Sequence, residues 1–421
     1  MSYYIKTLFY AIPTFAFLIL LEAIVAKVKG IEINRSADVI ASLSSGITNT
    51  IRDAIKFTFA LLTYSWLVEN IAVYKLESYW LVIFVAFLVK DFSGYWVHRL
   101  NHRVNVLWNR HFIHHSSEDF NLSCALRQSI SNTIKFSAIF MIPGALLGVP
   151  ASVFAVLGPI HLFMQLWYHT QLIGNLGVLE YIFVTPSHHR VHHAINDEYI
   201  DKNYGQILII WDKIFGTFQQ ELKTVSPVYG TLNQAGTWNP IIINYKYFYQ
   251  LLRDAWRAQK LIDKIKIWFM PTGWRPKDVL ENYPNNKLKI PGEQIKYNTD
   301  NSSLLILFCW AQLIFALVFM FHLFLVLHQY EPFLNYLYAI FIFLNIFSYT
   351  SLLDNSKLSL YAEMLKFLLG VGILQLQSFT WFNIGGVPVL LFLIISLLFT
   401  IFLYLNNQKT IKLTLVNNQP Q

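Results

Sequence analysis

The sequence predicts an all-α fold: a polytopic integral membrane helical bundle with a histidine-rich dimetal site on its cytoplasmic side. Three observations favour this fold class. Hydrophobic residues make up 55% of the 421 residues and charged residues only 13%, which argues against a soluble protein. Long, nearly uncharged runs occur at both ends of the chain. Eleven of the thirteen histidines lie between His98 and His193, and such clustering calls for a chemical reason.

The N-terminal zone, residues 1–79, is predicted to contain transmembrane segments. A helix needs about 20 apolar residues to cross a hydrocarbon core of about 30 Å. The run "LFYAIPTFAFLILLEAIVA" (8–26) meets this requirement. It lacks a small-residue cleavage site, so we expect a retained anchor rather than a signal peptide. A second span is predicted near 57–73.

Residues 80–220 are predicted to form the core that carries the histidines. The core begins with an apolar span at 80–97 and continues into a longer apolar stretch at 134–168. Glycine and proline residues interrupt the second stretch, so we expect a helical hairpin or a bent pair there instead of one straight helix.

The rest of the chain divides into a polar zone and a second apolar zone. Residues 221–302 are predicted to form a cytoplasmic polar and amphipathic region. Residues 303–406 are predicted to form a C-terminal four-helix transmembrane domain without a titratable cluster of its own, followed by a cytoplasmic tail at 407–421. The four apolar runs of this domain are 303–327, 333–353, 360–378 and 387–405.

Within the polar zone, the stretch 245–260 has helical amphipathic spacing. Tyr245, Phe248, Leu252 and Trp256 recur at intervals that place them on one helical face, with basic residues mostly on other faces. Two interpretations are open. The helix caps the soluble end of the bundle, or it lies in the lipid headgroup layer and covers the metal site.

The distribution of basic residues predicts the orientation in the membrane. The loops 328–332 and 377–386 contain no Lys or Arg, so both are expected outside. The zone 185–300, the loop around Lys357 and the C-terminal tail are expected in the cytoplasm. All the clustered histidines then lie on the cytoplasmic face, each near the end of an apolar segment, which suits a lipid substrate.

The histidines form three clusters, which we call box one ("HRLNH", 98–102), box two ("HFIHH", 111–115) and box three ("HHRVHH", 188–193). Residues i, i+3 and i+4 share a helical face, so each box is predicted to point its imidazoles in one direction. Eight imidazoles exceed the four ligands of tetrahedral zinc, which favours two adjacent metal ions. Neutral imidazole suits iron, zinc, copper or nickel. The predicted ligands from the boxes are His98, His102, His111, His114, His115, His189, His192 and His193.

Further residues near the boxes are candidates for supporting roles. His161 and His169 are eight residues apart and face roughly the same way on a helix, so one of them could complete a metal shell. Ligand histidines usually donate their second N–H to an oxygen, which makes nearby carboxylates candidates for that role; the alternative for each is a solvated loop charge. The candidates for supporting the ligands are Asp91, Glu118, Asp119, His161, His188, Asp201 and Asp212.

Four segments carry a resemblance to a known family: "HRLNH", "HFIHHSSEDFNLSCALRQS", "TPSHHRVHH" and "YIDKNYGQILIIWDKIFGTF". They resemble the fatty acid hydroxylase/sterol desaturase superfamily, and within it most of all the alkylglycerol monooxygenases and their bacterial relatives. The resemblance implies a membrane enzyme with a non-haem diiron centre that uses O₂ to oxidise a C–H bond of a lipid. It implies that the eight box histidines hold the two irons, with His169 as the additional histidine between boxes two and three. For the alkylglycerol monooxygenases it also implies ether cleavage, with tetrahydrobiopterin as electron donor.

Two positions depart from the pattern that the resemblance leads us to expect. Arg103 stands where an acidic residue is expected, and Gln171 stands where Glu is expected. We therefore expect a substrate or an electron donor, whether a pterin or a donor protein, that differs from those of the animal ether-lipid enzyme. No nucleic-acid partner is expected.

Three alternative functions are compatible with parts of the pattern. A sterol or fatty acid desaturase or hydroxylase of the same superfamily would use the same boxes. A metal transporter would place its histidines near the membrane midplane, whereas the boxes follow the ends of apolar segments. A histidine-ligated haem protein needs only one or two axial histidines.

Overall fold

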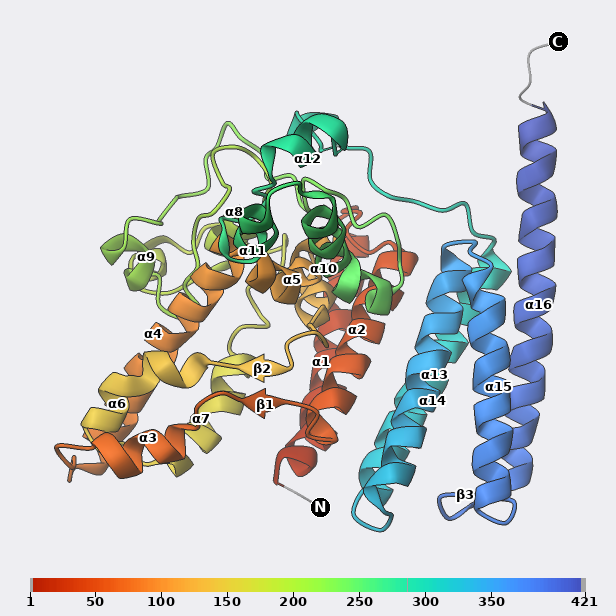
Figure 1. Cartoon of the computed structure of the whole chain (residues 1–421), viewed down its shortest axis with the longest axis horizontal. Coiled ribbons are helices and arrows are strands. Elements are labelled where there is room, and N and C mark those ends of the chain that lie inside the picture. The colour runs from red at the N-terminus through yellow and green to blue at the C-terminus, as the bar shows by residue number, and fades with distance from the viewer. Residues whose placement is uncertain (1–2, 286, 418–421) are drawn as a thin grey trace.

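The computed structural model describes residues 3–285 and 287–417, and it is mainly helical (Figure 1). Six of its helices are long and apolar enough to cross a membrane. The prediction of an all-α polytopic membrane protein is therefore confirmed. The candidate spans are Ile5–Val28, Tyr79–Arg103, Ser303–Val326, Pro332–Leu353, Leu358–Leu376 and Gly386–Gln408.

The N-terminal half alternates long helices with short turns. Its helices up to box two are α1 (Tyr3–Val28), α2 (Ser36–Ala54), α3 (Tyr64–Ile71), α4 (Tyr79–Arg103), α5 (Asn105–Phe112) and the 3₁₀ turn η1 (His114–Ser116). These are followed by the 3₁₀ turns η2 (Leu122–Leu126) and η3 (Ser137–Met141), then α6 (Ile142–Leu146) and α7 (Ala151–Phe163). Strands β1 (Phe59–Ala60) and β2 (Ile134–Lys135) pair in parallel.

The C-terminal half begins with short elements and ends with the long helices of the membrane domain. The short elements are η4 (Gly177–Tyr181), α8 (Pro186–His193), α9 (Ile210–Ile214), α10 (Pro240–Arg257), α11 (Leu261–Phe269), α12 (Lys277–Asn282) and η5 (Pro291–Glu293). The long helices are α13 (Ser303–Val326), α14 (Pro332–Leu353), α15 (Leu358–Leu376) and α16 (Gly386–Asn417). Strands β3 (Thr380–Trp381) and β4 (Ile384–Gly385) form an antiparallel pair between α15 and α16.

The predicted span at 57–73 is wrong. That segment contains the two-residue strand β1 and the eight-residue helix α3, which is too short to cross a membrane. The helix that the sequence did not reveal is α2, whose buried side chains include Ser42, Ser44 and Ser45. Because these hydroxyls bond to backbone carbonyls and to side chains from other elements, α2 is buried in spite of its polar composition.

The stretch 134–168 folds as two short apolar helical pieces, Ser137–Leu146 and Ala151–Phe163. Gly148 lies between them with a positive φ of 66°, which glycine adopts without steric cost. The expected bent pair is therefore present, and α7 packs beside α4, the helix that carries box one.

The C-terminal helices α13–α16 form an antiparallel bundle whose buried side chains continue into a core shared with α2. Figure 1 shows the polar elements α8–α12 at one end of the molecule and the β3 loop at the opposite end. The described part of the predicted tail, up to Asn417, continues the helix α16, and residues 418–421 lie outside the described residues.

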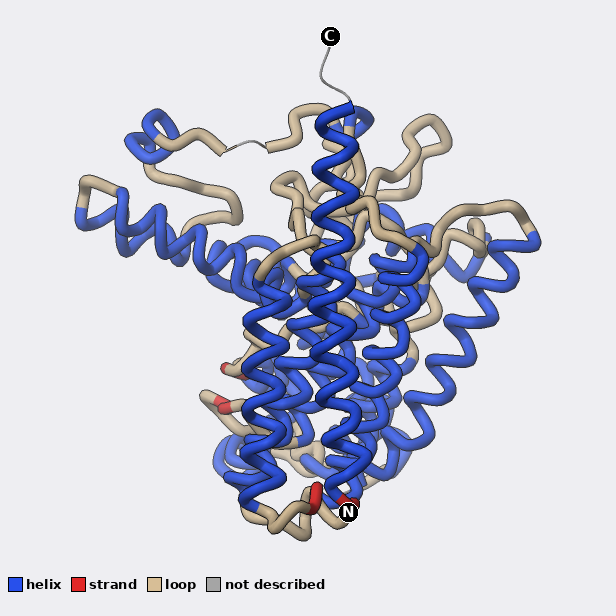
Figure 2. The backbone as a smooth tube through the Cα atoms, turned by 90° about the vertical axis from the view of Figure 1, so that its right-hand side faces the viewer, coloured by secondary structure: helices blue, strands red, loops and turns tan. Residues whose placement is uncertain are grey.

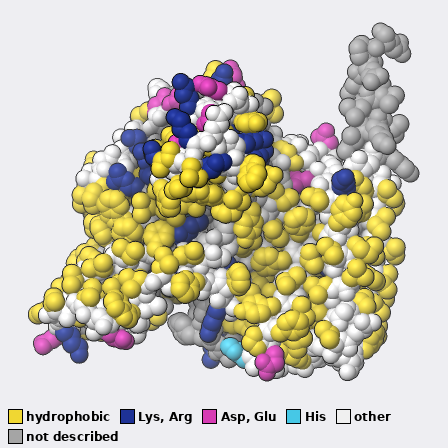
Figure 3. Space-filling model, viewed as in Figure 1, with side chains coloured by type: hydrophobic (Ala, Val, Ile, Leu, Met, Phe, Trp, Pro, Cys, Tyr) yellow, Lys and Arg dark blue, Asp and Glu magenta, His cyan; other side chains and the backbone are white. Residues whose placement is uncertain are grey.

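Two further views show where the polar end begins. Figure 2 shows the long helices running along one common direction, with most loops gathered at one end. Figure 3 shows hydrophobic side chains over the helical part and Lys and Arg mainly near that end. The lysine-free loops lie away from the polar zone, as the charge pattern predicts, and the assignment of the polar end to the cytoplasm stays a prediction.

Candidate metal centre

Nine histidine side chains from separate parts of the chain meet in two groups. Within each group the nitrogens available for a metal lie within 4.8 Å of one another. The five-histidine group consists of His98, His102, His111, His115 and His192. The four-histidine group consists of His114, His169, His189 and His193. The groups adjoin, because the rings of His115 and His193 stack with centroids 4.2 Å apart.

The helices explain how the boxes are divided between the groups. Box one lies in the last turns of α4, where the i, i+4 spacing points both imidazoles into the five-histidine group. Helix α5 ends at Phe112 and η1 begins at His114, so box two does not continue as one α-helix. As a result His114 enters the four-histidine group while His115 enters the other. The expectation that each box points in one direction holds only for box one.

Box three lies on α8, which begins with Pro186 at a favourable first position for proline. Its imidazoles also diverge. His192 joins the five-histidine group, and His189 and His193 join the four-histidine group. Helix α8 therefore contributes one histidine to the five-histidine group and two to the four-histidine group. His169, which follows α7, is the fourth histidine of the four-histidine group, beside one from box two and two from box three.

Backbone carbonyls fix the orientation of four of these rings. A carbonyl oxygen only accepts hydrogen bonds, so the Nδ1 atom facing it carries the hydrogen, and the Nε2 atom of the neutral ring keeps a lone pair. The pairs are His98 Nδ1 with the Tyr204 carbonyl (2.8 Å), His114 with Arg127 (3.2 Å), His169 with Gln165 (3.0 Å) and His192 with Lys202 (2.9 Å).

The Nε2 atoms of the four-histidine group crowd together. His193 Nε2 lies 3.1 Å from His114 Nε2 and 3.0 Å from His189 Nε2. His169 Nε2 lies 2.8 Å from His189 Nε2 and 3.5 Å from His114 Nε2. Since His114 and His169 both present lone pairs, no hydrogen bond joins those two atoms. A cation between them satisfies both, because adjacent ligands at about 2.1 Å from a metal lie about 3 Å apart.

In the five-histidine group, three of the ring nitrogens lack a hydrogen-bond partner among the described residues. The Nε2 atoms of His102, His115 and His192 are buried and have no partner in the described part of the chain. Buried polar atoms without a partner are costly, so the convergence of these nitrogens fits a bound cation. The two groups therefore fit two metal ions held by neutral imidazoles, as in many sites for divalent iron or zinc.

Burial also sets the protonation state of these rings. Burial lowers the pKa of His169 to about 3. Burial, followed by repulsion between neighbouring imidazoles, lowers the pKa of the six predicted ligands in boxes two and three well below the ordinary value. The rings are therefore neutral near pH 7, which is the form that binds metals.

The supporting carboxylates act mostly through the backbone. Among the candidates, Asp201 lies nearest to a ligand, with Oδ1 3.9 Å from Nδ1 of His102. Asp212 accepts hydrogen bonds from the backbone N–H of Tyr204 and Gly205, both at 2.7 Å. It thereby holds in place the carbonyl that orients His98.

Asp91 also acts at a distance. It accepts the N–H groups of Ile207 and Leu208 and fixes the same loop. His161 donates to or accepts from this carboxylate at 2.9 Å and does not join either metal group. His188 is buried, with Nε2 3.9 Å from Glu180.

Glu118 and Asp119 bond to segments outside the boxes. Glu118 accepts the backbone N–H of Tyr297 at 2.5 Å. Asp119 forms ion pairs with Arg35 and Lys296, each at 2.7 Å. Both carboxylates connect segments of the chain that lie around the site.

Sequence reasoning missed the ion pair between Arg127 and Asp38. The two side chains are buried and meet at 2.8 Å, and the Arg127 carbonyl orients His114. The sequence offered one signal, an arginine in an otherwise uncharged segment after box two. Its partner lies on α2, a helix the sequence did not reveal.

A polar pocket of about 510 Å³ opens beside the five-histidine group. Its lining includes Arg99, Arg103, Lys202 and Tyr204. Arg103 donates to Asp201 at 2.7 Å, so an acidic group from another segment stands beside box one. Tyr204, which lines the pocket, also packs against the ring of His102, with centroids 5.2 Å apart.

The sequence is similar to known proteins that act on lipids. The sequence model of the fatty acid hydroxylase family matches residues 83–217. Alkylglycerol monooxygenase of Homo sapiens is 39% identical over 312 residues, which cover 73% of this chain and 69% of that protein. The protein of the same name from Danio rerio is 42% identical over 273 residues, covering 63% of this chain and 59% of the relative.

A bacterial relative matches a shorter part of the chain. Ornithine lipid hydroxylase OlsE of Rhizobium tropici is 35% identical over 136 residues, which cover 32% of this chain and 41% of that protein. No solved structure matches the chain.

Proposed function

The chain belongs to the alkylglycerol monooxygenase family and is a lipid-oxidising membrane enzyme, and we propose that two iron ions held by the nine histidines carry its reaction. The observation that supports this most directly is the convergence of lone pairs in two adjoining groups of buried imidazoles. When bound, the irons would supply the redox chemistry that uses O₂ to break a lipid C–H bond.

The residues around the boxes would keep the site rigid and dry. The carbonyls of Tyr204, Arg127 and Lys202 orient ligand rings through their Nδ1 atoms. Aromatic rings pack against the imidazoles: the ring centroids of Tyr168 and His189 lie 4.3 Å apart, and those of Phe120 and His193 lie 5.2 Å apart. Such apolar walls exclude water from the site.

Metal analysis of single-site variants tests the two-iron proposal. His192 belongs to the five-histidine group and His114 to the four-histidine group. Each of His192→Ala and His114→Ala should abolish lipid oxidation and lower the iron content from two per chain, while the protein stays in the membrane. Full iron and full activity in both variants would refute the proposal.

For the substrate, we propose an ether lipid of the alkylglycerol type. The proposal rests on the names of the relatives that cover most of the chain. Hydroxylation of the carbon next to the ether oxygen gives a hemiacetal, which collapses to an aldehyde and a glycerol. Lipid profiling of membranes with and without the active protein tests this: alkylglycerols should accumulate when it is inactivated. Accumulation of sterol precursors or unhydroxylated acyl chains instead would favour a desaturase or hydroxylase function.

The reaction also needs an electron donor, since inserting one oxygen atom of O₂ and reducing the other to water takes two electrons and two protons. We propose that the donor, tetrahydrobiopterin or an electron-donor protein, approaches from the polar end. Because Arg103 pairs with Asp201, and Gln171 donates to the Phe120 carbonyl, these two departures from the family pattern are built into the site. We expect donor preference to differ from that of the animal enzyme. Pterin-dependent alkylglycerol cleavage at the animal enzyme's rate would contradict this.

We further propose that the polar end faces the cytoplasm, and that the chain is organised into the segments 1–79, 80–220, 221–302, 303–406 and 407–421. Both native cysteines are buried, so labelling by a thiol reagent reports on an introduced, exposed cysteine. Glu198→Cys, at an exposed position beside box three, should react with an impermeant thiol reagent only after cells are opened. Labelling on intact cells would reverse the topology.

A further inference from the structure

Helices α10 and α11 expose large hydrophobic side chains on the faces that point away from the protein. On α10 these are Tyr245, Tyr249, Leu252 and Trp256, exposed by 46, 64, 46 and 85%. On α11 they are Leu261, Ile262, Ile265 and Phe269, exposed by 73, 53, 55 and 72%. The stripe on α10 differs from the predicted one at one position, because Phe248 packs against Trp268 with centroids 5.6 Å apart. We call residues 240–270 the arm.

The opposite faces of the arm are fixed to the protein. Ile243, Tyr247 and Leu251 of α10 and Ile267 of α11 are buried in one cluster with Phe112 and Ile113, next to box two. The Tyr247 hydroxyl donates to Asn105 Oδ1 at 2.6 Å. The arm is therefore a rigid part of the fold with a second apolar face that no described residue covers.

Positive charge accompanies the exposed apolar face. Residues 240–270 contain six Lys or Arg and two Asp. One of the acids, Asp254, is buried and paired with Arg275 at 2.7 Å. Among the cations, Arg253, Lys260 and Lys266 are exposed. A surface with aromatic and aliphatic side chains beside exposed cations complements an anionic membrane surface.

The position of the arm agrees with such a contact. Candidate span α4 ends at Arg103, and the next helix begins at Asn105. The N–H of Asn105 donates to the carbonyl of Met270, so the end of the arm is tied to the end of a span. In Figure 1, α10 and α11 are seen nearly end-on while α13–α16 run up the page, so the arm lies across the direction of the spans. That orientation is parallel to the plane of a membrane that α13–α16 cross.

We propose that the exposed faces of α10 and α11 lie on the membrane at the polar end of the protein and bind anionic lipid headgroups. The apolar stripes enter the boundary between headgroups and acyl chains, and Arg253, Lys260 and Lys266 contact the phosphates. Since the buried side of the arm packs on the segment that carries box two, membrane contact and the metal site share one rigid unit.

Depth-dependent quenching in reconstituted vesicles tests the apolar contact. Cysteines introduced by Trp256→Cys and Ile265→Cys, each carrying an environment-sensitive fluorophore, should be quenched several-fold more strongly by lipid-borne quenchers than a label at Glu281→Cys. Glu281 is exposed on α12, which Figure 1 places at the far edge of the polar end. Equal exposure of all three labels to an aqueous quencher would overturn the proposal. Shielding of the arm labels from both quenchers would overturn it in favour of a protein partner.

A charge series tests the lipid class. In vesicles with phosphatidylserine, quenching at Ile265→Cys should exceed that in phosphatidylcholine alone. Adding R253Q, K260Q and K266Q should remove this difference. The matched control, K277Q, K287Q and K289Q, neutralises three exposed lysines outside the arm and should preserve it. Equal losses in both triple variants, or no dependence on phosphatidylserine in the unsubstituted arm, would refute anionic-lipid recognition.

Discussion

At the scale of single residues, the buried ion pair between Asp38 and Arg127 connects α2 to the metal site. The Arg127 guanidinium also donates to Ser42 and Ser116 at 2.9 and 2.7 Å. These bonds leave the backbone of Arg127 little freedom, and its carbonyl faces Nδ1 of His114. We infer that Arg127 positions His114 without touching the metal or the substrate.

The substitution Asp38→Asn tests this role. It leaves the buried Arg127 charge without a counter-charge, which typically costs about 3–5 kcal/mol of unfolding free energy. Because the backbone of Arg127 is then held less firmly, its carbonyl orients the His114 ring less well, and the iron content of the folded protein should fall as well. Thermal unfolding in detergent and metal analysis measure the two effects. In the control Glu281→Gln, which breaks an exposed pair with Lys277, both quantities should stay unchanged.

If Asp38→Asn lost stability but retained two irons per folded chain, the ion pair would have only a structural role. The more conservative Asp38→Glu keeps the charge and should restore part of the iron content.

Residue spacing predicted which histidines form the metal site, but not how they are distributed between its two groups. All nine predicted ligands meet in the structure. Histidines at helical spacing near the ends of apolar spans indicate a metal site, and this pattern is visible in the sequence. The division of His114 from His115 depends on a break between α5 and η1 that spacing alone does not encode. The carbonyl partners of the rings come from distant loops, so no local pattern could reveal them.

At the scale of elements, the long apolar helices were predictable and the buried polar ones were not. Hydropathy over about 20 residues identifies α1, α4 and α13–α16, because the bilayer requires that length. Helix α2 was not predicted because its polar composition hides its burial: Ser42, Ser44 and Ser45 bond to groups from other elements. The apolar segment at 57–73 was misleading, since its exposed side chains, such as Phe57 and Trp66, belong to short elements at the protein surface.

The C-terminal bundle contains a buried ionic network that the sequence did not predict. Lys366 Nζ lies 2.6 Å from Glu363 Oε1 and also donates to Asn345 and Ser396. The second carboxylate oxygen of Glu363 accepts from Ser348 at 2.6 Å. Three helices, α14, α15 and α16, therefore share one hydrogen-bond network. The statement that this domain lacks a titratable cluster is wrong, because two separate charges in α15 meet only once the helix forms.

Substitution within this network should show whether it holds the bundle together. Lys366→Met leaves Glu363 buried and unpaired and should lower the unfolding free energy by about 3–5 kcal/mol. The double variant Lys366→Met/Glu363→Gln removes both charges and should recover a large part of this loss. Chemical unfolding in detergent measures both. An equal loss in the single and double variants would show that packing, rather than the charge pair, accounts for the stability.

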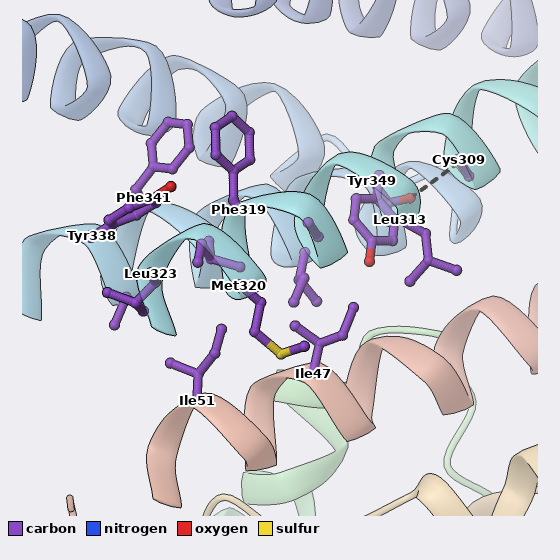
Figure 4. Close-up of a cluster of buried hydrophobic side chains, with 14 of the residues drawn as sticks. Ile47, Ile51, Cys309, Leu313, Phe319, Met320, Leu323, Tyr338, Phe341 and Tyr349 are labelled. Carbon is purple, nitrogen blue, oxygen red and sulfur yellow. Dashed lines mark hydrogen bonds between the residues drawn. The ribbon is translucent and has the colours of Figure 1, made fainter. Parts of the chain in front are cut away.

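At the scale of the whole molecule, α2 joins the metal-binding core to the C-terminal bundle. Figure 4 shows Ile47 and Ile51 of α2 pointing toward Leu313, Met320 and Leu323 of the bundle. The Ser44 hydroxyl also bonds with the Tyr349 hydroxyl at 2.6 Å. Another face of the same helix carries Asp38, the partner of Arg127. The bundle thus supports the helix on which the position of His114 depends.

This connection predicts that a defect on the bundle side of α2 weakens the metal site. Ile51 is fully buried, so Ile51→Ala should lower the unfolding free energy by about 2–5 kcal/mol. Because α2 then packs less tightly, iron should be lost more readily to a chelator even from the folded protein. In the control Leu398→Ala, on a position of α16 that is 61% exposed, neither quantity should change. An Ile51→Ala protein that is less stable but releases iron at the unsubstituted rate would show that the bundle anchors the chain in the membrane without supporting the metal centre. Faster release at every temperature below unfolding would show that the C-terminal domain contributes to the catalytic core across α2.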